Sequence, residues 1–202
     1  MKRIDIFLAL ITGFGVGILF DWLLKQSGFL LPFSPLILNL ILFFVFPFLT
    51  LFGLKIAEIL GKKYLFIYQL AKFLLVGALF ALLDLLVLNS LFKWFGIEKT
   101  QILKYTIFVA ISFTIATTLK YLANKYWAFE KVEKGKREFE IFFVITLISL
   151  FWQMGTASLV FKLLTSIFNF SSVFAGNLGK ILGIIVASTW NFLGYKFVVF
   201  KK

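Results

Sequence analysis

Two polar side chains lie inside apolar runs, where each could bind a polar group within a membrane. Asp84 follows seven apolar residues and precedes four more, and Gln153 lies in a second, mostly apolar run. An ionised carboxylate in hydrocarbon is costly, so Asp84 is expected to be protonated, paired or beside a hydrated cavity. Both groups could hydrogen-bond the hydroxyls of a molecule in transit. The alternative is interhelical contact, which for Asp84 would be a hydrogen bond to Gln153 or Asn89.

A second polar group lies where two apolar runs end. It comprises Lys120, Asn124, Lys125, Asn191 and Lys196. A lysine at a helix end can bind a lipid phosphate as a point charge. Each residue alone also has a structural explanation, because cations stabilise helix C-termini and lysines extend to the interface without a ligand. Recurrence in both runs favours Lys125 and Lys196 as ligands, whereas Trp127 is expected to be an interface aromatic.

An internal repeat relates these groups. Residues 116–131 and 187–202 match at Ala, Thr, Leu, Lys, Phe and Lys positions, and residues 68–95 align without a gap on residues 137–164. The alignment pairs Asp84 with Gln153. A unit of two spans returns the chain to its starting side, so the copies would be parallel repeats about an axis along the membrane normal. The sequence predicts two helical hairpins, at about 68–131 and 137–202.

The composition indicates a membrane protein. Hydrophobic residues make up 61% of the 202 residues and aromatics 20%, which is too apolar for a soluble domain. The net charge of +12 is carried in gaps between apolar runs. Anionic lipid headgroups lie at that level, so we expect membrane lipids and no nucleic acid as partners. With no Cys, no His and only nine acidic residues, we expect no disulfide, metal site or cofactor.

Six apolar runs predict an all-α integral membrane protein with six transmembrane helices. The runs cover approximately residues 6–24, 36–60, 64–95, 101–123, 139–164 and 173–196. Residues 1–63 would form an N-terminal two-helix membrane hairpin, and residues 64–202 a four-helix membrane domain. Most of the 21 Lys and Arg residues fall on the side of the two termini, which predicts cytoplasmic termini.

Two of these runs carry further local signals. Gly13 and Gly17 have the four-residue spacing that lets two membrane helices approach closely. The third run is longer than one span needs. Its first residues, including Gln69 and Lys72, are therefore expected to lie in the membrane interface.

Three segments carry a family resemblance. They are KFLLVGALFALLDLLVLNSLF at 72–92, NKYWAFEK at 124–131 and WNFLGYKFVVFKK at 190–202. Through them, residues 66–202 resemble the GtrA-like family of small membrane proteins. Its members often carry Asn and a basic residue, then an aromatic, a small residue and Phe, after the second family helix. The chain keeps Asn124, Lys125, Trp127 and Phe129 but has Lys120 where a polar, often Asn, residue is usual.

The resemblance implies the handling of lipid-linked sugars in the synthesis of cell-surface polysaccharides at the cell inner (cytoplasmic) membrane. The activity implied is flipping of a polyprenyl-phosphate monosaccharide, such as bactoprenol-linked glucose, to the outer leaflet, beside a membrane glycosyltransferase. Similar four-helix units also occur fused to such glycosyltransferases. As a translocase, the chain would use Asp84 and Gln153 for the sugar hydroxyls and Lys125 or Lys196 for the phosphate.

The sequence is also compatible with two other functions and with a homo-oligomer. The chain could be a membrane anchor or scaffold that holds a glycosyltransferase without moving lipid, in which case Asp84→Asn would be silent. It could also be a small proton-coupled exporter that uses Asp84, in which case transport would follow the pH gradient. No nucleophile lies beside a base and no carboxylates pair outside the membrane, so no enzyme activity and no catalytic residue is expected.

Overall fold

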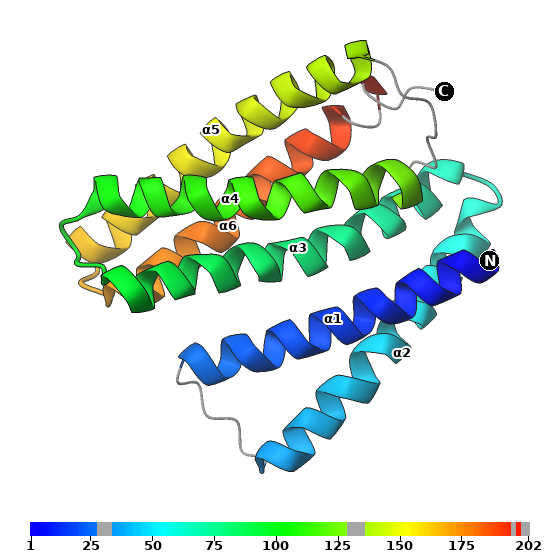
Figure 1. Ribbon diagram of the computed structural model, residues 1–202, viewed down its shortest axis with the longest axis horizontal. Helices are drawn as coiled ribbons and strands as arrows, with labels where there is room; N and C mark the ends of the chain where they lie inside the picture. Colours follow the sequence, from blue (N-terminus) through cyan, green and yellow to red (C-terminus); the bar gives the residue numbers. More distant parts are fainter. Residues whose placement is uncertain (28–33, 129–135, 195–196, 199–202) are drawn as a thin grey trace. The chain divides into compact units, whose positions relative to one another are not determined.

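The computed structural model is built of helices and describes residues 1–27, 34–128, 136–194 and 197–198 (Figure 1). In order the elements are α1 (Arg3–Ser27), α2 (Pro35–Gly61), α3 (Leu65–Phe95), α4 (Ile102–Ala123), the π-helical turn η1 (Asn124–Ala128), α5 (Lys136–Ser166) and α6 (Ser172–Gly194). Each of the six α-helices contains a segment long and apolar enough to cross a membrane. The prediction of an all-helical protein with six membrane-spanning helices is confirmed. The repeat relationship within it stays a prediction.

The helix ends coincide with local signals. The Ser34 side chain accepts a hydrogen bond from the Ile37 backbone N–H, and Pro35 occupies the first turn of α2, where no donor is lost. Gly96 follows the last residue of α3 at φ 66°, a left-handed conformation that suits glycine at a helix C-terminus. Ser171 caps α6 by accepting from the Phe174 N–H. Short connections with these caps separate the spans.

Packing divides the chain into two compact units. Unit 1 comprises Met1–Leu86 with Lys120–Glu130, and unit 2 comprises Val87–Leu119 with Lys131–Lys202. Unit 1 therefore contains α1, α2, the longer first part of α3 and η1, whereas unit 2 contains α5 and α6. The sequence-based boundary near residue 64 describes relatedness rather than packing, and it stays a prediction.

In unit 1, α1 packs closely against α2 through its glycines (Figure 1). A Cβ atom on Gly13 would lie 2.5 Å from Pro47 Cα, and one on Gly17 would lie 2.7 Å from the Leu42 carbonyl oxygen. Thr50 adds a hydrogen bond of 2.9 Å to the carbonyl of Ala9. The close approach predicted from the glycine spacing is confirmed.

In unit 2, α5 and α6 lie side by side, and glycines of α6 let the two helices approach closely (Figure 1). A Cβ atom on Gly179 would lie 2.7 Å from the Ala157 carbonyl oxygen. The Tyr105 ring stacks on Phe161 at 4.4 Å between centroids, and its hydroxyl donates to the Gly176 carbonyl at 2.8 Å. These contacts place α4 against both helices and form the apolar core of this unit.

Candidate functional site

Unit 1 contains four of the seven predicted site residues, all buried and all on membrane-spanning segments. Asp84 lies about two thirds of the way along α3, Lys120 lies near the end of α4, and Asn124 and Lys125 begin η1. They are exposed by 8% or less. Burial of this many polar groups within apolar spans is costly unless they have partners or a ligand, so their contacts decide what the site can do.

The Lys120 side chain is buried inside the protein, so it does not extend to the surface, which was the structural alternative for a lysine at a helix end. Its ammonium lies 5.3 Å from the centroid of the Phe73 ring and interacts electrostatically with Asp84. Helical side chains lean toward the N-terminus of their helix, so a lysine near the end of α4 is directed back along the span. Asp84 and Lys120 thus place opposite charges near each other on two adjacent helices.

Asn124 has a buried side-chain amide at the start of η1. Its side chain is fully buried, and neither amide atom has a hydrogen-bond partner among the described residues. An unsatisfied buried polar group of this kind costs about 1–3 kcal/mol. Asn124 follows Lys120 by one helical turn and therefore lies on the same helix face. It also begins a π-helical turn, a deformation that is frequent at functional sites.

Lys125 is enclosed by aromatic rings. Its ammonium lies 5.9 Å from the ring centroids of both Tyr121 and Tyr126, within the range of cation–π attraction.

Trp127 is buried in the core of unit 1 with Ala9, and its indole N–H donates to the Asp5 carboxylate. The expectation of an interface aromatic is therefore wrong for this residue. The second predicted phosphate ligand, Lys196, lies outside the described residues, as does Phe129.

Unit 2 contains the remaining predicted residues, Gln153 and Asn191, and both are buried. Gln153 lies where α6 passes closest to α5, since a Cβ atom on Gly183 would meet the Gln153 carbonyl oxygen at 2.8 Å. The Asn191 side-chain oxygen has no hydrogen-bond partner among the described residues. Asp84 and Gln153 belong to different units, so a hydrogen bond between them stays a prediction.

Two buried lysines were missed as site candidates, and the first is Lys180 in α6. Its ammonium donates to the Val109 carbonyl at 3.1 Å and to the Ser112 hydroxyl at 2.9 Å. Its side chain is fully buried. A lysine inside an apolar span is itself a sufficient sequence signal for a functional or structural polar site.

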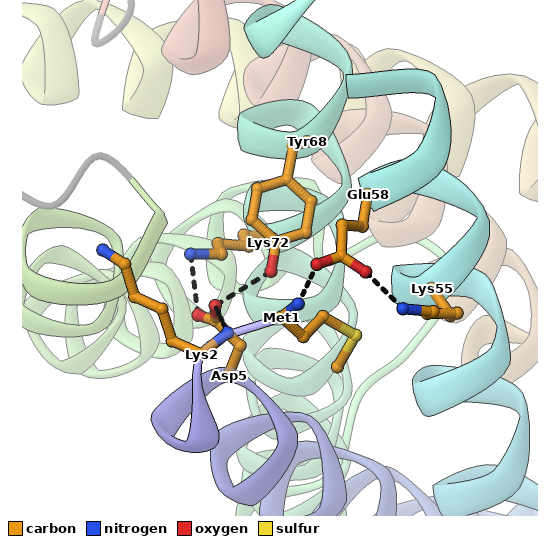
Figure 2. A network of polar contacts seen from close by, with 7 residues as sticks. All are labelled: Met1, Lys2, Asp5, Lys55, Glu58, Tyr68 and Lys72. Carbon is orange, nitrogen blue, oxygen red and sulfur yellow. Dashed lines mark hydrogen bonds and ion pairs between the residues drawn. The ribbon is translucent and has the colours of Figure 1, made fainter. Parts of the chain in front are cut away.

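The second is Lys72, which the sequence predicted to lie in the interface. Its side chain is buried, as is that of Gln69, and its ammonium pairs with Asp5 of α1 at 2.7 Å (Figure 2). The interface level of this part of α3 stays a prediction. The phenol of Tyr68 donates to the same carboxylate at 2.9 Å. Hydropathy alone could not pair residues so far apart in the sequence, although an acidic residue at the start of the first span was a visible signal.

Buried ionisable and amide side chains within apolar spans mark a candidate polar site in a membrane protein. No group of residues able to hold a metal ion occurs in the described ranges. The family model for the GtrA/DPMS transmembrane domain matches residues 72–200, which is more than half of the chain. The protein therefore belongs to this family, as the resemblance predicted, and the match includes all seven predicted site residues. Comparison with curated proteins and with solved structures found no match.

Proposed function

We propose that this protein moves a polyprenyl-phosphate-linked monosaccharide across the cytoplasmic membrane for the synthesis of cell-surface glycans. Family membership supports this class of substrate. The observation that carries the proposal is the buried amide of Asn124, which has no hydrogen-bond partner among the described residues. It lies on the same helix face as Lys120, which interacts with Asp84. A site with unused hydrogen-bonding capacity inside a membrane span suits a ligand that brings hydroxyl groups.

The chemistry of the three side chains matches a sugar. A hydroxyl both donates and accepts, and the Asn124 amide can do both in return, while Asp84 accepts and Lys120 donates. Without such partners, each hydroxyl that crosses the apolar middle would cost several kcal/mol, roughly 2–7 by transfer scales. The opposite charges of Asp84 and Lys120 reduce the cost of keeping either one in the span. Within unit 2, Gln153 and Asn191 would offer further polar partners for the sugar.

The phosphate of the lipid would bind nearer the cytoplasmic surface. Lys125 and Lys196 are the proposed ligands, each contributing on the order of 1 kcal/mol near the headgroup plane. The protein would lie in the inner membrane with both termini in the cytoplasm and would receive its lipid from a membrane glycosyltransferase. Cysteines placed at 135 and 171 should accordingly label from the cytoplasmic and external sides.

A flipping assay tests the proposal. Purified protein is reconstituted into liposomes with labelled polyprenyl-phosphate sugar in one leaflet, and an impermeant reagent reports its arrival in the other. Asp84→Asn should slow arrival at any pH gradient, because the amide weakens both the interaction with Lys120 and the acceptor for the sugar. The matched control is Thr114→Val, which changes an exposed hydroxyl bonded only to its own helix.

The alternatives give different results in the same assay. If the labelled lipid arrives no faster with wild-type protein than in empty liposomes, the translocase proposal fails and the scaffold function replaces it. Transport that depends on a pH gradient and loses that dependence in Asp84→Asn would indicate the proton-coupled exporter.

A further inference from the structure

The Asp5 carboxylate of α1 is held by an unusually complete set of donors. Lys72 Nζ lies 2.7 Å from Oδ1, the Tyr68 hydroxyl lies 2.9 Å from Oδ2, and the Trp127 indole N–H reaches Oδ1 at 3.1 Å. The backbone N–H of Lys2 adds a fourth contact at 3.2 Å. Figure 2 shows Lys72 and Tyr68 converging from α3 on this one group.

The donors and the acceptor come from different parts of the chain. Lys72 and Trp127 lie within the family match, which begins at Lys72, and Tyr68 lies one helical turn before it. Asp5 lies outside the match, on the added N-terminal hairpin. The helices α3 and η1 thus supply three donor side chains, an ammonium, a phenol and an indole, whereas the N-terminal hairpin supplies the anion and one backbone N–H.

Stability alone does not account for this arrangement. Asp5 and Lys72 are both almost completely buried, and a buried ion pair can often be replaced by apolar residues of similar volume without loss of stability. An ammonium with two neutral donors within hydrogen-bond distance of one carboxylate is the donor set of an oxyanion site. Because a phosphate presents the same kind of charged oxygen, it could accept from the same three side chains.

We propose that Lys72, Tyr68 and Trp127 form a binding site for a lipid phosphate, and that the Asp5 carboxylate occupies this site from within the same chain. The ligand class is a phosphate ester in the headgroup region, and Asp5 is its internal competitor. The inference deepens the proposed function and depends on it for the identity of the lipid. The site uses residues of α3 and η1 and includes neither Lys125 nor Lys196.

The test measures binding with the full chain in neutral detergent and fluorescent polyprenyl phosphate as the probe. Asp5→Asn removes the competing charge while keeping the size of the side chain. If Asp5 occupies the site nearly all the time, its removal should tighten binding by at least about tenfold, because apparent affinity scales with the fraction of open sites. Asp5→Glu is the matched control, since it keeps a carboxylate and should bind like the wild type.

Two further arms identify the site and the ligand. Asp5→Asn combined with Lys72→Gln should lose the gain in affinity, and labelled polyprenol without phosphate should show no gain in any variant. Inorganic phosphate that displaces the fluorescent polyprenyl phosphate would show that the phosphate group alone is recognised. If inorganic phosphate does not displace the probe, and polyprenol without phosphate does not bind, the site requires the lipid and the phosphate together. Unchanged binding in Asp5→Asn, or a gain that survives Lys72→Gln, would overturn the proposal.

Lower stability of Asp5→Asn would not prevent the test. A phosphate that replaces the missing carboxylate should raise the melting temperature of Asp5→Asn more than that of Asp5→Glu, because a ligand stabilises the state that binds it. If polyprenyl phosphate raises the melting temperature of neither variant, the site is not a phosphate site. Because the readout is binding, tight binding without flipping contradicts only the proposed function, whereas flipping without the Asp5→Asn gain contradicts only this inference.

Discussion

Lys72 in unit 1 and Lys180 in unit 2 are both buried, but the two units hold them differently. Lys72 pairs with the Asp5 carboxylate, which comes from a helix outside the family match. Lys180 donates to the carbonyl of Val109 and the hydroxyl of Ser112, both on α4 within the match. A charge held by another charge depends on that partner far more than a charge held by several dipoles. The comparison predicts that unit 1 is sensitive to single changes that unit 2 tolerates.

The largest effect should come from Asp5→Ala. Removing the carboxylate leaves the buried Lys72 ammonium uncompensated, which should lower the free energy of unfolding by about 3–5 kcal/mol. Unfolding in detergent, followed by helix content, measures it, with Glu98→Ala as the control because Glu98 is exposed. The double variant Asp5→Leu with Lys72→Met should recover most of the loss. A change below about 1 kcal/mol in the single variant, the usual range of a surface ion pair, would contradict the buried pair.

Intermediate effects should follow from closing the helix contacts in either unit. Gly13→Ala in unit 1 and Gly179→Ala in unit 2 would each place a methyl group against backbone atoms, at 2.5 and 2.7 Å. Each should cost about 1–3 kcal/mol by overpacking. Gly53→Ala is the matched control, because nothing lies within 4 Å of its Cβ position and alanine favours a helix. Equal stability of all three variants in the same unfolding assay would rule out close glycine packing.

The smallest effect should come from Lys180→Met. Both acceptors keep a partner when the ammonium is removed, since the Ser112 hydroxyl also donates to the Val109 carbonyl at 3.2 Å. The expected loss is only about 1 kcal/mol, the net value of an ordinary hydrogen bond. Lys162→Met, at an exposed position of α5, serves as the control in the unfolding measurement. A loss as large as that of Asp5→Ala would show that the two units do not differ in the way proposed.

Hydropathy and local signals were sufficient for the helices but not for the contacts between them. Six apolar runs predicted the spans, and the spacing of Gly13 and Gly17 predicted a close helix contact. The ion pair of Lys72 was not predicted, because hydropathy cannot reveal that Asp5 lies opposite it in space. The burial of Lys120 was not predicted either, because a lysine near a helix end can also extend to the interface, whereas the direction of helical side chains points it back along α4.

The candidate site was predictable in part. Asp84, Asn124 and Gln153 stood out as polar residues in or beside apolar runs, and the structure buries all three. The electrostatic interaction of Asp84 with Lys120 could not be predicted, because it depends on the register between α3 and α4. The unsatisfied amide of Asn124 could not be predicted either, because a missing partner is a property of the packed protein.

The most direct test compares stability and flipping in one variant, Asn124→Leu. If the buried amide is kept for a sugar, leucine of similar size should leave the free energy of unfolding unchanged or raise it by about 1–3 kcal/mol, since it removes an unsatisfied polar group. The same variant should slow flipping of polyprenyl-phosphate sugar in proteoliposomes by at least about tenfold, because a hydroxyl then lacks its partner in the span. If Asn124→Leu flips the lipid at the wild-type rate and is equally stable, the proposal that the Asn124 amide binds the sugar is contradicted.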